Sequence, residues 1–164
     1  MRFRKLFVLS AFAFASACSS TPTNFAGTYT LSTTQNADDC NLGSASWTPG
    51  STTNFTGTFT QDGTAAQITV TGGAAVVLNV VVGTDTFQGS VSGNTFTSEL
   101  IGTKKQTDGA CSWSTNIAIS ASLDSNSVLS GTITLTPITN GDPSCGAKNS
   151  CANTETVSGN RTGP

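Results

Sequence analysis

Short runs in which apolar and hydroxyl-bearing residues alternate make up most of this sequence. In residues 25–33, for example, Phe25, Tyr29 and Leu31 occupy odd positions, while threonine and serine occupy most of the even ones. A period of two residues is typical of a β-strand that buries one face. The good helix formers Glu, Lys, Arg, Gln and Met are scarce, so no helix is expected. We therefore predict an all-β fold.

Turn signals follow one another at close spacing and divide the chain into short strands. Asp62-Gly63 between two alternating runs is typical of a β-hairpin. The predicted strands are residues 25–33, 55–61, 66–71, 76–82, 86–91, 95–101, 112–123, 128–136 and 153–160. Such a series predicts an antiparallel up-and-down meander of eight or nine strands in one domain, residues 25–162. We expect it to close into a β-barrel, because closure removes exposed strand edges; a β-sandwich is the alternative.

Alternation alone does not say which face of the strands points inward. A membrane-spanning barrel also alternates, but most runs are shorter than the ~9–11 residues that a spanning strand needs. No paired aromatic girdles are visible either. We therefore expect a soluble barrel with the apolar rows inside. The predicted core comprises Phe25, Tyr29, Leu31, Phe55, Phe59, Ile68, Val70, Leu78, Phe87, Val91, Phe96, Leu100, Ile117, Ile119, Leu123, Leu129, Ile133, Leu135 and Val157.

Four of the predicted strands share a frame in which a bulky residue is followed, two positions later, by a glycine. These glycines are Gly27, Gly57, Gly89 and Gly131. An inward glycine leaves room for a bulky neighbour or lets the sheet bend at a barrel corner. The alternative is that strands built from few residue types simply look alike.

The first 17 residues have the composition of an export signal. A basic start is followed by the apolar run 6–14 and by small residues before a cysteine. Residues 15–18, Ala-Ser-Ala-Cys, resemble the lipobox of bacterial lipoproteins, with Ala15 where the family usually has Leu. The resemblance implies cleavage after Ala17, diacylglyceryl transfer to the Cys18 sulfur and acylation of its amine. Ordinary secretory cleavage at the same place is the alternative, because the three residues also satisfy the small-x-small rule.

A lipidated Cys18 would place the domain close to a membrane of the cell envelope. Residues 18–24 would form a polar tether that reaches about 20 Å when extended. Ser19 stands where an Asp would resemble an inner-membrane retention signal. The outer membrane is therefore the expected location, with the periplasmic or surface face left open.

The number of cysteines agrees with this assignment. The chain has five cysteines, and a lipidated Cys18 leaves an even set of four, suited to two disulfides in an oxidising compartment. Of the three possible pairings, we favour a local Cys145–Cys151 bridge and a long-range Cys40–Cys111 bridge. A zinc site is the alternative. No metal is expected, because the chain lacks histidine and any Cys-x-x-Cys motif.

The charge balance and the missing histidine exclude several classes of function. Three of the seven basic residues precede Cys18, so four basic residues accompany nine acidic ones, a net charge of −5. Nucleic acids and anionic membranes are bound by clustered Lys and Arg, so neither is expected as a partner. Without histidine, Ser-His-Asp and Cys-His catalysis are impossible. Carboxylate pairs for glycoside hydrolysis are conceivable, yet most acids lie in predicted turns; we expect no enzyme activity and no cofactor.

Long polar loops are the places where a binding function would lie. They are residues 34–53, 102–110 and 137–152. Trp47, in the first loop, is the candidate binding residue, because an amphipathic ring can anchor a ligand or partner. The alternative is that Trp47 folds down as a lid over the end of the barrel. Trp113 is in phase with the apolar row of its strand and is assigned to the core.

A second resemblance concerns the first strand. Gly27-Thr28-Tyr29 is similar to the Gly-x-Trp of lipocalins and the Gly-Thr-Trp of avidin-like proteins, with Tyr29 in place of Trp. It implies an up-and-down barrel, with residues 34–53 as an end-loop lid and a small apolar ligand. We therefore expect a non-catalytic envelope lipoprotein that binds a small apolar ligand or an envelope protein through its end loops. The alternative is a structural coat lipoprotein with a solid barrel and no ligand.

Overall fold

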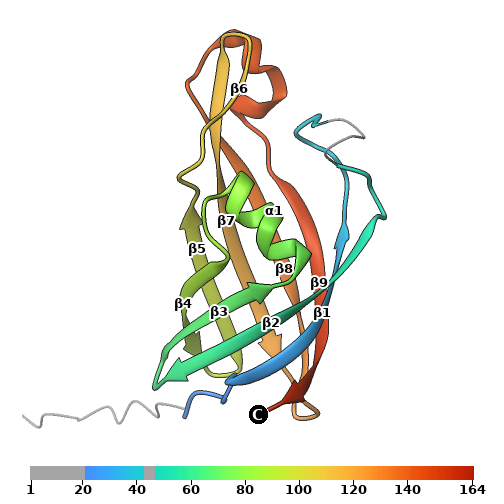
Figure 1. Cartoon of the computed structure of the whole chain (residues 1–164), viewed down its shortest axis with the longest axis vertical. Helices are drawn as coiled ribbons and strands as arrows, with labels where there is room; N and C mark the ends of the chain where they lie inside the picture. Colours follow the sequence, from blue (N-terminus) through green and yellow to red (C-terminus); the bar gives the residue numbers. More distant parts are fainter. Residues whose placement is uncertain (1–20, 43–46) are drawn as a thin grey trace, which may run out of the picture.

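Eight strands close into an antiparallel β-barrel in the computed structural model, which describes residues 21–42 and 47–164 (Figure 1). The barrel strands are β1 (Gly27–Gln35), β2 (Thr52–Asp62), β3 (Ala65–Thr71), β4 (Thr86–Ser92), β5 (Thr95–Ile101), β7 (Cys111–Leu123), β8 (Val128–Thr139) and β9 (Asn153–Gly163). The sheet order is β5-β4-β3-β2-β1-β9-β8-β7, and pairing of β5 with β7 closes it. The predicted closed meander is confirmed. The predicted signal peptide, residues 1–17, and Cys18 lie outside the described residues.

The two ends of the barrel differ in how they connect the strands. At one end, tight turns join β2 to β3, β4 to β5 and β7 to β8, and residues 21–26 and the end of β9 lie beside them (Figure 1). We call this the tether end. At the opposite end, which we call the loop end, the connections are longer: residues 36–51, 72–85, 102–110 and 140–152.

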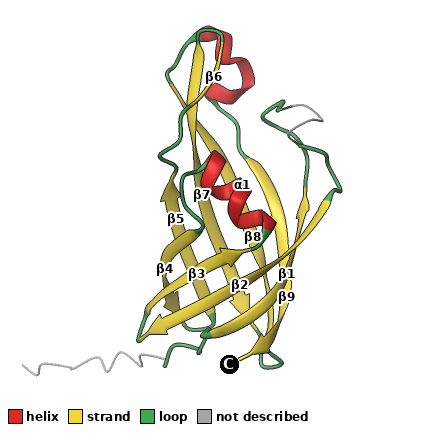
Figure 2. Ribbon diagram, in the orientation of Figure 1, coloured by secondary structure: helices red, strands yellow, loops and turns green. Residues whose placement is uncertain are grey.

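The predicted strand over residues 76–82, and with it the prediction of no helix, is wrong. Residues 76–81 lie in helix α1 (Gly73–Val81), and Val82 is its C-cap; the helix covers part of the loop end between β3 and β4 (Figure 2). The reason is topological: β3 and β4 pair directly with each other, so a strand between them would have no partner. Helix formation satisfies the backbone within the segment and packs Leu78 against the core. Within the described ranges, no helix has the length and hydrophobicity needed to cross a bilayer.

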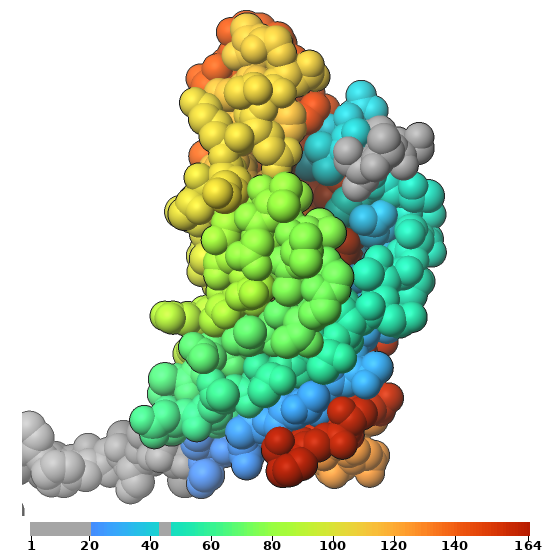
Figure 3. Space-filling model, viewed as in Figure 1, coloured from blue at the N-terminus to red at the C-terminus, as the bar shows by residue number. Residues whose placement is uncertain are grey.

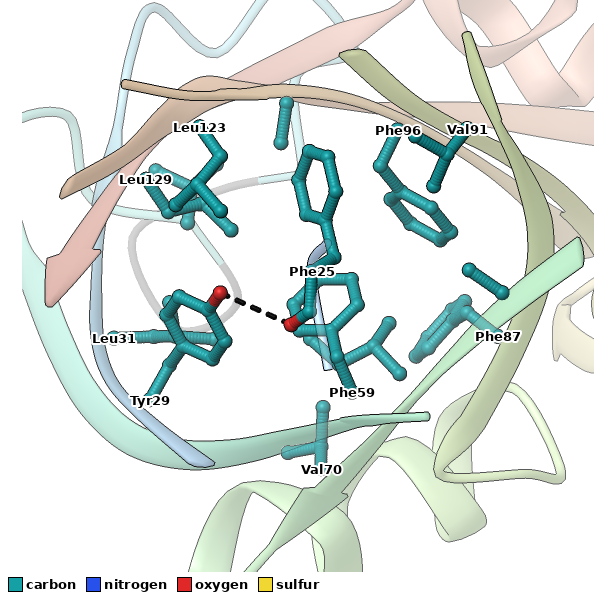
Figure 4. Packing of buried hydrophobic residues seen from close by; sticks show 14 of the residues in the cluster. Phe25, Tyr29, Leu31, Phe59, Val70, Phe87, Val91, Phe96, Leu123 and Leu129 are labelled. Atoms are coloured by element: carbon teal, nitrogen blue, oxygen red, sulfur yellow. Dashed lines mark hydrogen bonds between the residues drawn. The ribbon is translucent and has the colours of Figure 1, made fainter. Parts of the chain in front are cut away.

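The apolar rows meet inside the barrel. All predicted core residues except Trp113 belong to one buried cluster or pack against it. In the half of the barrel nearest the tether end, the rings of Phe25, Tyr29, Phe59 and Phe96 form a cluster in which the centroids of contacting rings lie 5.1–6.2 Å apart (Figure 4). Tilted and edge-to-face rings at this spacing are favourable. Aromatic side chains therefore fill this half of the interior.

Two of the repeated glycines make close packing possible, and Gly57 does so in the way that the frame predicts. A Cβ atom on Gly57 would come within 2.9 Å of both the Ile68 and the Leu31 side chains. On Gly131, it would lie 2.2 Å from the Ser120 carbonyl oxygen. The first glycine therefore leaves room for bulky neighbours, and the second allows β7 and β8 to approach closely.

Candidate functional site

Both disulfides lie at the loop end. Cys40 pairs with Cys151, and Cys111 pairs with Cys145, so the expected disulfides are confirmed but the predicted pairing is wrong. The correct pairs follow strand adjacency. Cys40 follows β1 and Cys151 precedes the neighbouring β9, whereas Cys111 begins β7 and Cys145 follows the neighbouring β8.

The loop that follows β1 is held down by the first disulfide and by a buried amide. Asn153 is fully buried; its Oδ1 accepts a hydrogen bond from the Cys40 backbone at 2.9 Å, and its Nδ2 donates to the Asp38 carboxylate at 3.0 Å. Trp47 is only 4% exposed, and its Nε1 donates to the Asn36 carbonyl oxygen at 2.9 Å. The structure therefore places the indole of Trp47 inside its own loop and not on the surface.

A second part of the loop end projects beyond the barrel. We call it the arm: residues 102–115 and 137–152 (Figure 1; the same projection is seen in the space-filling view of Figure 3). It forms because β7 and β8 are longer than β5, so the start of β7 pairs with the short strand β6 (Gln106–Asp108) and with the end of β8. Within the arm, the 3-10 helix η1 (Pro143–Asn149) packs against β8 and β7 and is tied to β7 by Cys111–Cys145. The sequence predicts loops over residues 102–110 and 137–152, so β6 and η1 were not expected.

Side chains lock the arm together from within. Asn140 accepts a hydrogen bond from the Ser112 backbone at 3.2 Å and donates to the Ala110 carbonyl oxygen at 2.9 Å. Asp142 caps η1 by accepting from the Ser144 backbone at 2.8 Å, and this bond lowers the pKa of the Asp142 carboxyl. The arm is therefore a braced projection.

The arm contains a pocket of about 300 Å³ with an aromatic wall. Trp113 and Ile138 contribute apolar surface, Ser114 a hydroxyl group and Lys105 an ammonium group. Ile138 is 43% exposed, and the Nζ atom of Lys148 lies 5.2 Å from the centroid of the Trp113 ring. Trp113 is partly exposed on the arm, so its assignment to the barrel core is wrong.

A second hollow lies on the outer wall of the barrel. Its volume is about 450 Å³, and β4, β5, β7 and β8 contribute mostly hydroxyl-bearing residues to it. Glu99 is the one carboxylate in its lining, and it accepts a hydrogen bond from Asn116 at 2.9 Å. A single carboxylate does not provide the acid and base pair that glycoside hydrolysis needs.

The tether end is closed by a hydrogen-bonded plug. Phe25, which precedes β1, is fully buried, and its backbone N–H donates to Gln61 Oε1 at 2.7 Å. Gln61 donates in turn to the Thr23 carbonyl oxygen at 3.1 Å, and the Thr23 N–H donates to the Gly93 carbonyl oxygen at 2.7 Å. The chain is therefore attached to the barrel from Thr23 onward.

Arg161 joins the end of β9 to the same plug, a role that was not predicted from the sequence. Its Nε and Nη2 donate to the Tyr29 hydroxyl oxygen at 2.9 and 2.8 Å, and Nη2 also donates to the Asn24 carbonyl oxygen. The guanidinium carbon lies 5.4 Å from the centroid of the Tyr29 ring. Burial raises the pKa of Tyr29, although Arg161 opposes this effect, so the phenol stays protonated and donates to the Phe25 carbonyl oxygen.

One carboxyl group faces the interior of the barrel in the half nearest the loop end. Glu155 lies on β9 between the buried residues Asn153 and Val157, and its cross-strand partner on β8 is Ile133. Burial raises its pKa, partly offset by hydrogen bonds from Thr33 and Gln35. Across the described ranges, no three Cys, Asp or Glu side chains come close enough together to hold a metal ion.

Replacing Glu155 with glutamine is expected to stabilise the protein at neutral pH. A raised folded-state pKa means that the protonated carboxyl favours folding below the unfolded pKa of about 4.3 and that this contribution is lost as pH rises through the folded pKa. E155Q should therefore match the original protein at pH 4 and unfold at a higher temperature at pH 7. E99Q, on the outer wall, is the matched control and should change the unfolding free energy by less than about 0.5 kcal/mol. An equal gain in both variants would contradict the burial argument.

Comparison with known proteins finds no matching family model, no matching curated protein and no matching solved structure.

Proposed function

We propose that this protein is a lipid-anchored protein of the cell envelope whose barrel presents its loop end to a ligand or a partner, without catalysis. The observation that carries the proposal is the structural difference between the two ends of the barrel. The chain enters at the tether end, whereas the four long connections and both disulfides lie at the other (Figure 1). A barrel held at one end in this way directs the other end away from the membrane.

The plug at the tether end supports a defined orientation. Because the chain is attached to the barrel from Thr23 onward, only residues 18–22 would separate a lipidated Cys18 from the barrel. Five extended residues span about 17 Å at most. The barrel would therefore stand close to the outer membrane with its loop end outward.

The braced loops support binding as the role of the loop end. Loops on a rigid scaffold are where binding residues concentrate, and loops fixed before binding lose less conformational entropy when a ligand arrives. Cys40–Cys151 and Cys111–Cys145 fix two of the long connections in this way. The filled aromatic half of the interior argues for a ligand at the loop end and not deep inside the barrel (Figure 4).

A structural coat protein without a ligand is the second candidate. The same filled interior favours it. The two candidates differ in what they require of the loop end, because a coat protein needs no specific contact there.

Photo-crosslinking in the cells that make the protein separates these candidates. A photoreactive residue is placed at Thr107 on the arm or at Thr64 in the β2–β3 turn at the tether end, both of which are exposed. We expect a discrete adduct from position 107 and none from position 64. Equal adducts from both ends would overturn the proposal, and no adduct from either end would favour the coat protein. Mass spectrometry of the mature N-terminus, with C18S as the control that lacks the lipid, tests the anchor.

A further inference from the structure

Positive charge in the described chain is concentrated on the arm. Lys104, Lys105 and Lys148 are the only lysines after the predicted signal, and all three belong to the arm. The remaining basic residue, Arg161, is bound to Tyr29 at the tether end. Among the described residues, none of the three lysines forms an ion pair. The arm therefore carries three ammonium groups against the two carboxylates of Asp108 and Asp142, whereas the rest of the chain after Cys18 carries one basic residue against seven acidic ones.

The arm pocket combines these charges with apolar surface. Lys105 and Trp113 line it together with the exposed side chain of Ile138, and Lys148 lies against the Trp113 ring. Ligand pockets are typically apolar, with a few polar groups that set orientation and specificity. An indole and an aliphatic side chain suit the face of a ring, whereas an ammonium group suits an anion. The volume of about 300 Å³ suits a ligand of a single ring.

We propose that the arm pocket binds a six-membered ring compound that carries a carboxylate. The ring packs against Trp113 and Ile138, and the carboxylate pairs with the Lys105 ammonium group. The hydroxyl groups of Thr103 and Ser114, which also line the pocket, contact the polar edge of the ring. This inference rests on the proposed function, since it names the ligand chemistry of the loop end. An acidic sugar unit of an envelope polysaccharide and a free aromatic acid share this chemistry.

Two acids and their neutral counterparts test the proposal on the mature lipidated protein in detergent. D-glucuronate is compared with D-glucose, and benzoate with benzyl alcohol, by calorimetry and by the NMR shift of the Trp113 indole N–H. We expect saturable binding of one or both acids, with the neutral counterpart at least about tenfold weaker because the charged hydrogen bond is lost. Stronger binding of glucuronate identifies a sugar as the source, and stronger binding of benzoate a free aromatic acid.

Adjacent lysines provide the matched variants. K105Q should weaken binding of the acid by about tenfold. K104Q removes the same charge from a residue that does not line the pocket, and it should weaken binding by less than about twofold, as expected for an exposed charge at a distance. Equal losses in both variants would indicate attraction by net charge alone and overturn the proposed site.

Two further results would also overturn the site. One is the absence of saturable binding of either acid at concentrations on the order of 10 mM, weaker than most specific ligands. The other is equal binding of the neutral counterparts. Either result leaves the proposed function intact if the adduct at position 107 still forms. If that adduct does not form while an acid still binds, the proposed contact with a partner is contradicted and the proposed pocket is supported.

Discussion

Replacement of Phe25 by alanine is expected to lower the free energy of unfolding by about 3–5 kcal/mol, the range for deleting a buried phenylalanine side chain. Phe25 is fully buried: the centroid of its ring lies 5.7 Å from that of Phe59 and 6.2 Å from that of Phe96. Its removal leaves a cavity between strands that cannot collapse, because the barrel is closed around it. Urea denaturation measures the loss.

The same substitution at Phe55 is the matched control. Phe55 is also an inward phenylalanine, on β2, but it is only partly buried. F55A should therefore cost less than F25A. Because F25A removes a large share of a typical domain stability of about 5–15 kcal/mol, F25L serves as a milder variant that keeps most of the buried volume. Equal effects at positions 25 and 55, or no effect of F25A, would contradict the plug.

Release of the plug should also lengthen the tether. The hydrogen bonds that fix residues 23–25 depend on Phe25 holding the segment inside the barrel. In F25A we expect a protease to cut near residues 21–26 under conditions in which the barrel stays folded. Protection of this segment in F25A would show that Gln61 and Arg161 are sufficient to hold it.

The barrel itself was predictable from the sequence because its rules are local. A period of two residues defines the inward row, and tight turns such as Asp62-Gly63 define antiparallel neighbours. The row that contains Tyr29 and Leu31 therefore identifies core residues without any knowledge of the topology. Inward glycines such as Gly57 are predictable for the same reason.

The errors concern residues whose partners are set by the closed topology. Residues 76–82 have strong β-propensity, yet they form part of a helix because β3 and β4 pair with each other and leave no strand partner. Likewise, their short separation along the chain favours a Cys145–Cys151 bridge. In the structure, each cysteine instead forms a disulfide with a cysteine next to the neighbouring strand of the barrel. Arg161 was missed because its contact with Tyr29 arises only when the last strand pairs with the first.

Trp113 illustrates the same limit within the candidate site. Its phase along β7 is that of the inward row, so alternation assigns it to the core. The strand, however, continues beyond the end of β5, and there is no barrel interior at that level to receive the ring. A signal for the arm was present in the unequal lengths of the predicted strands 95–101 and 112–123.

Loss of the two disulfides is expected to have different effects, although both lie at the loop end. Cys40–Cys151 joins residues 111 positions apart and links the regions beside β1 and β9, the first and last strands of the barrel. Chain entropy assigns a loop of this length a contribution of about 4.7 kcal/mol. The double variant C40S/C151S should therefore lower the global free energy of unfolding by about 2–5 kcal/mol, measured by urea denaturation.

Cys111–Cys145 spans 34 positions, and its loop would contribute about 4 kcal/mol by the same chain-entropy argument. The two residues lie on the arm, outside the barrel, so the arm can open while the barrel stays folded. C111S/C145S should therefore change global stability less than C40S/C151S and should accelerate amide hydrogen exchange only in the arm, residues 102–115 and 137–152. Both variants are compared in a C18S background, which leaves no fifth thiol to pair. A larger global loss in C111S/C145S, or uniform exchange along the chain, would mean that the arm and the barrel unfold as one unit and that the arm is not an independent projection for binding.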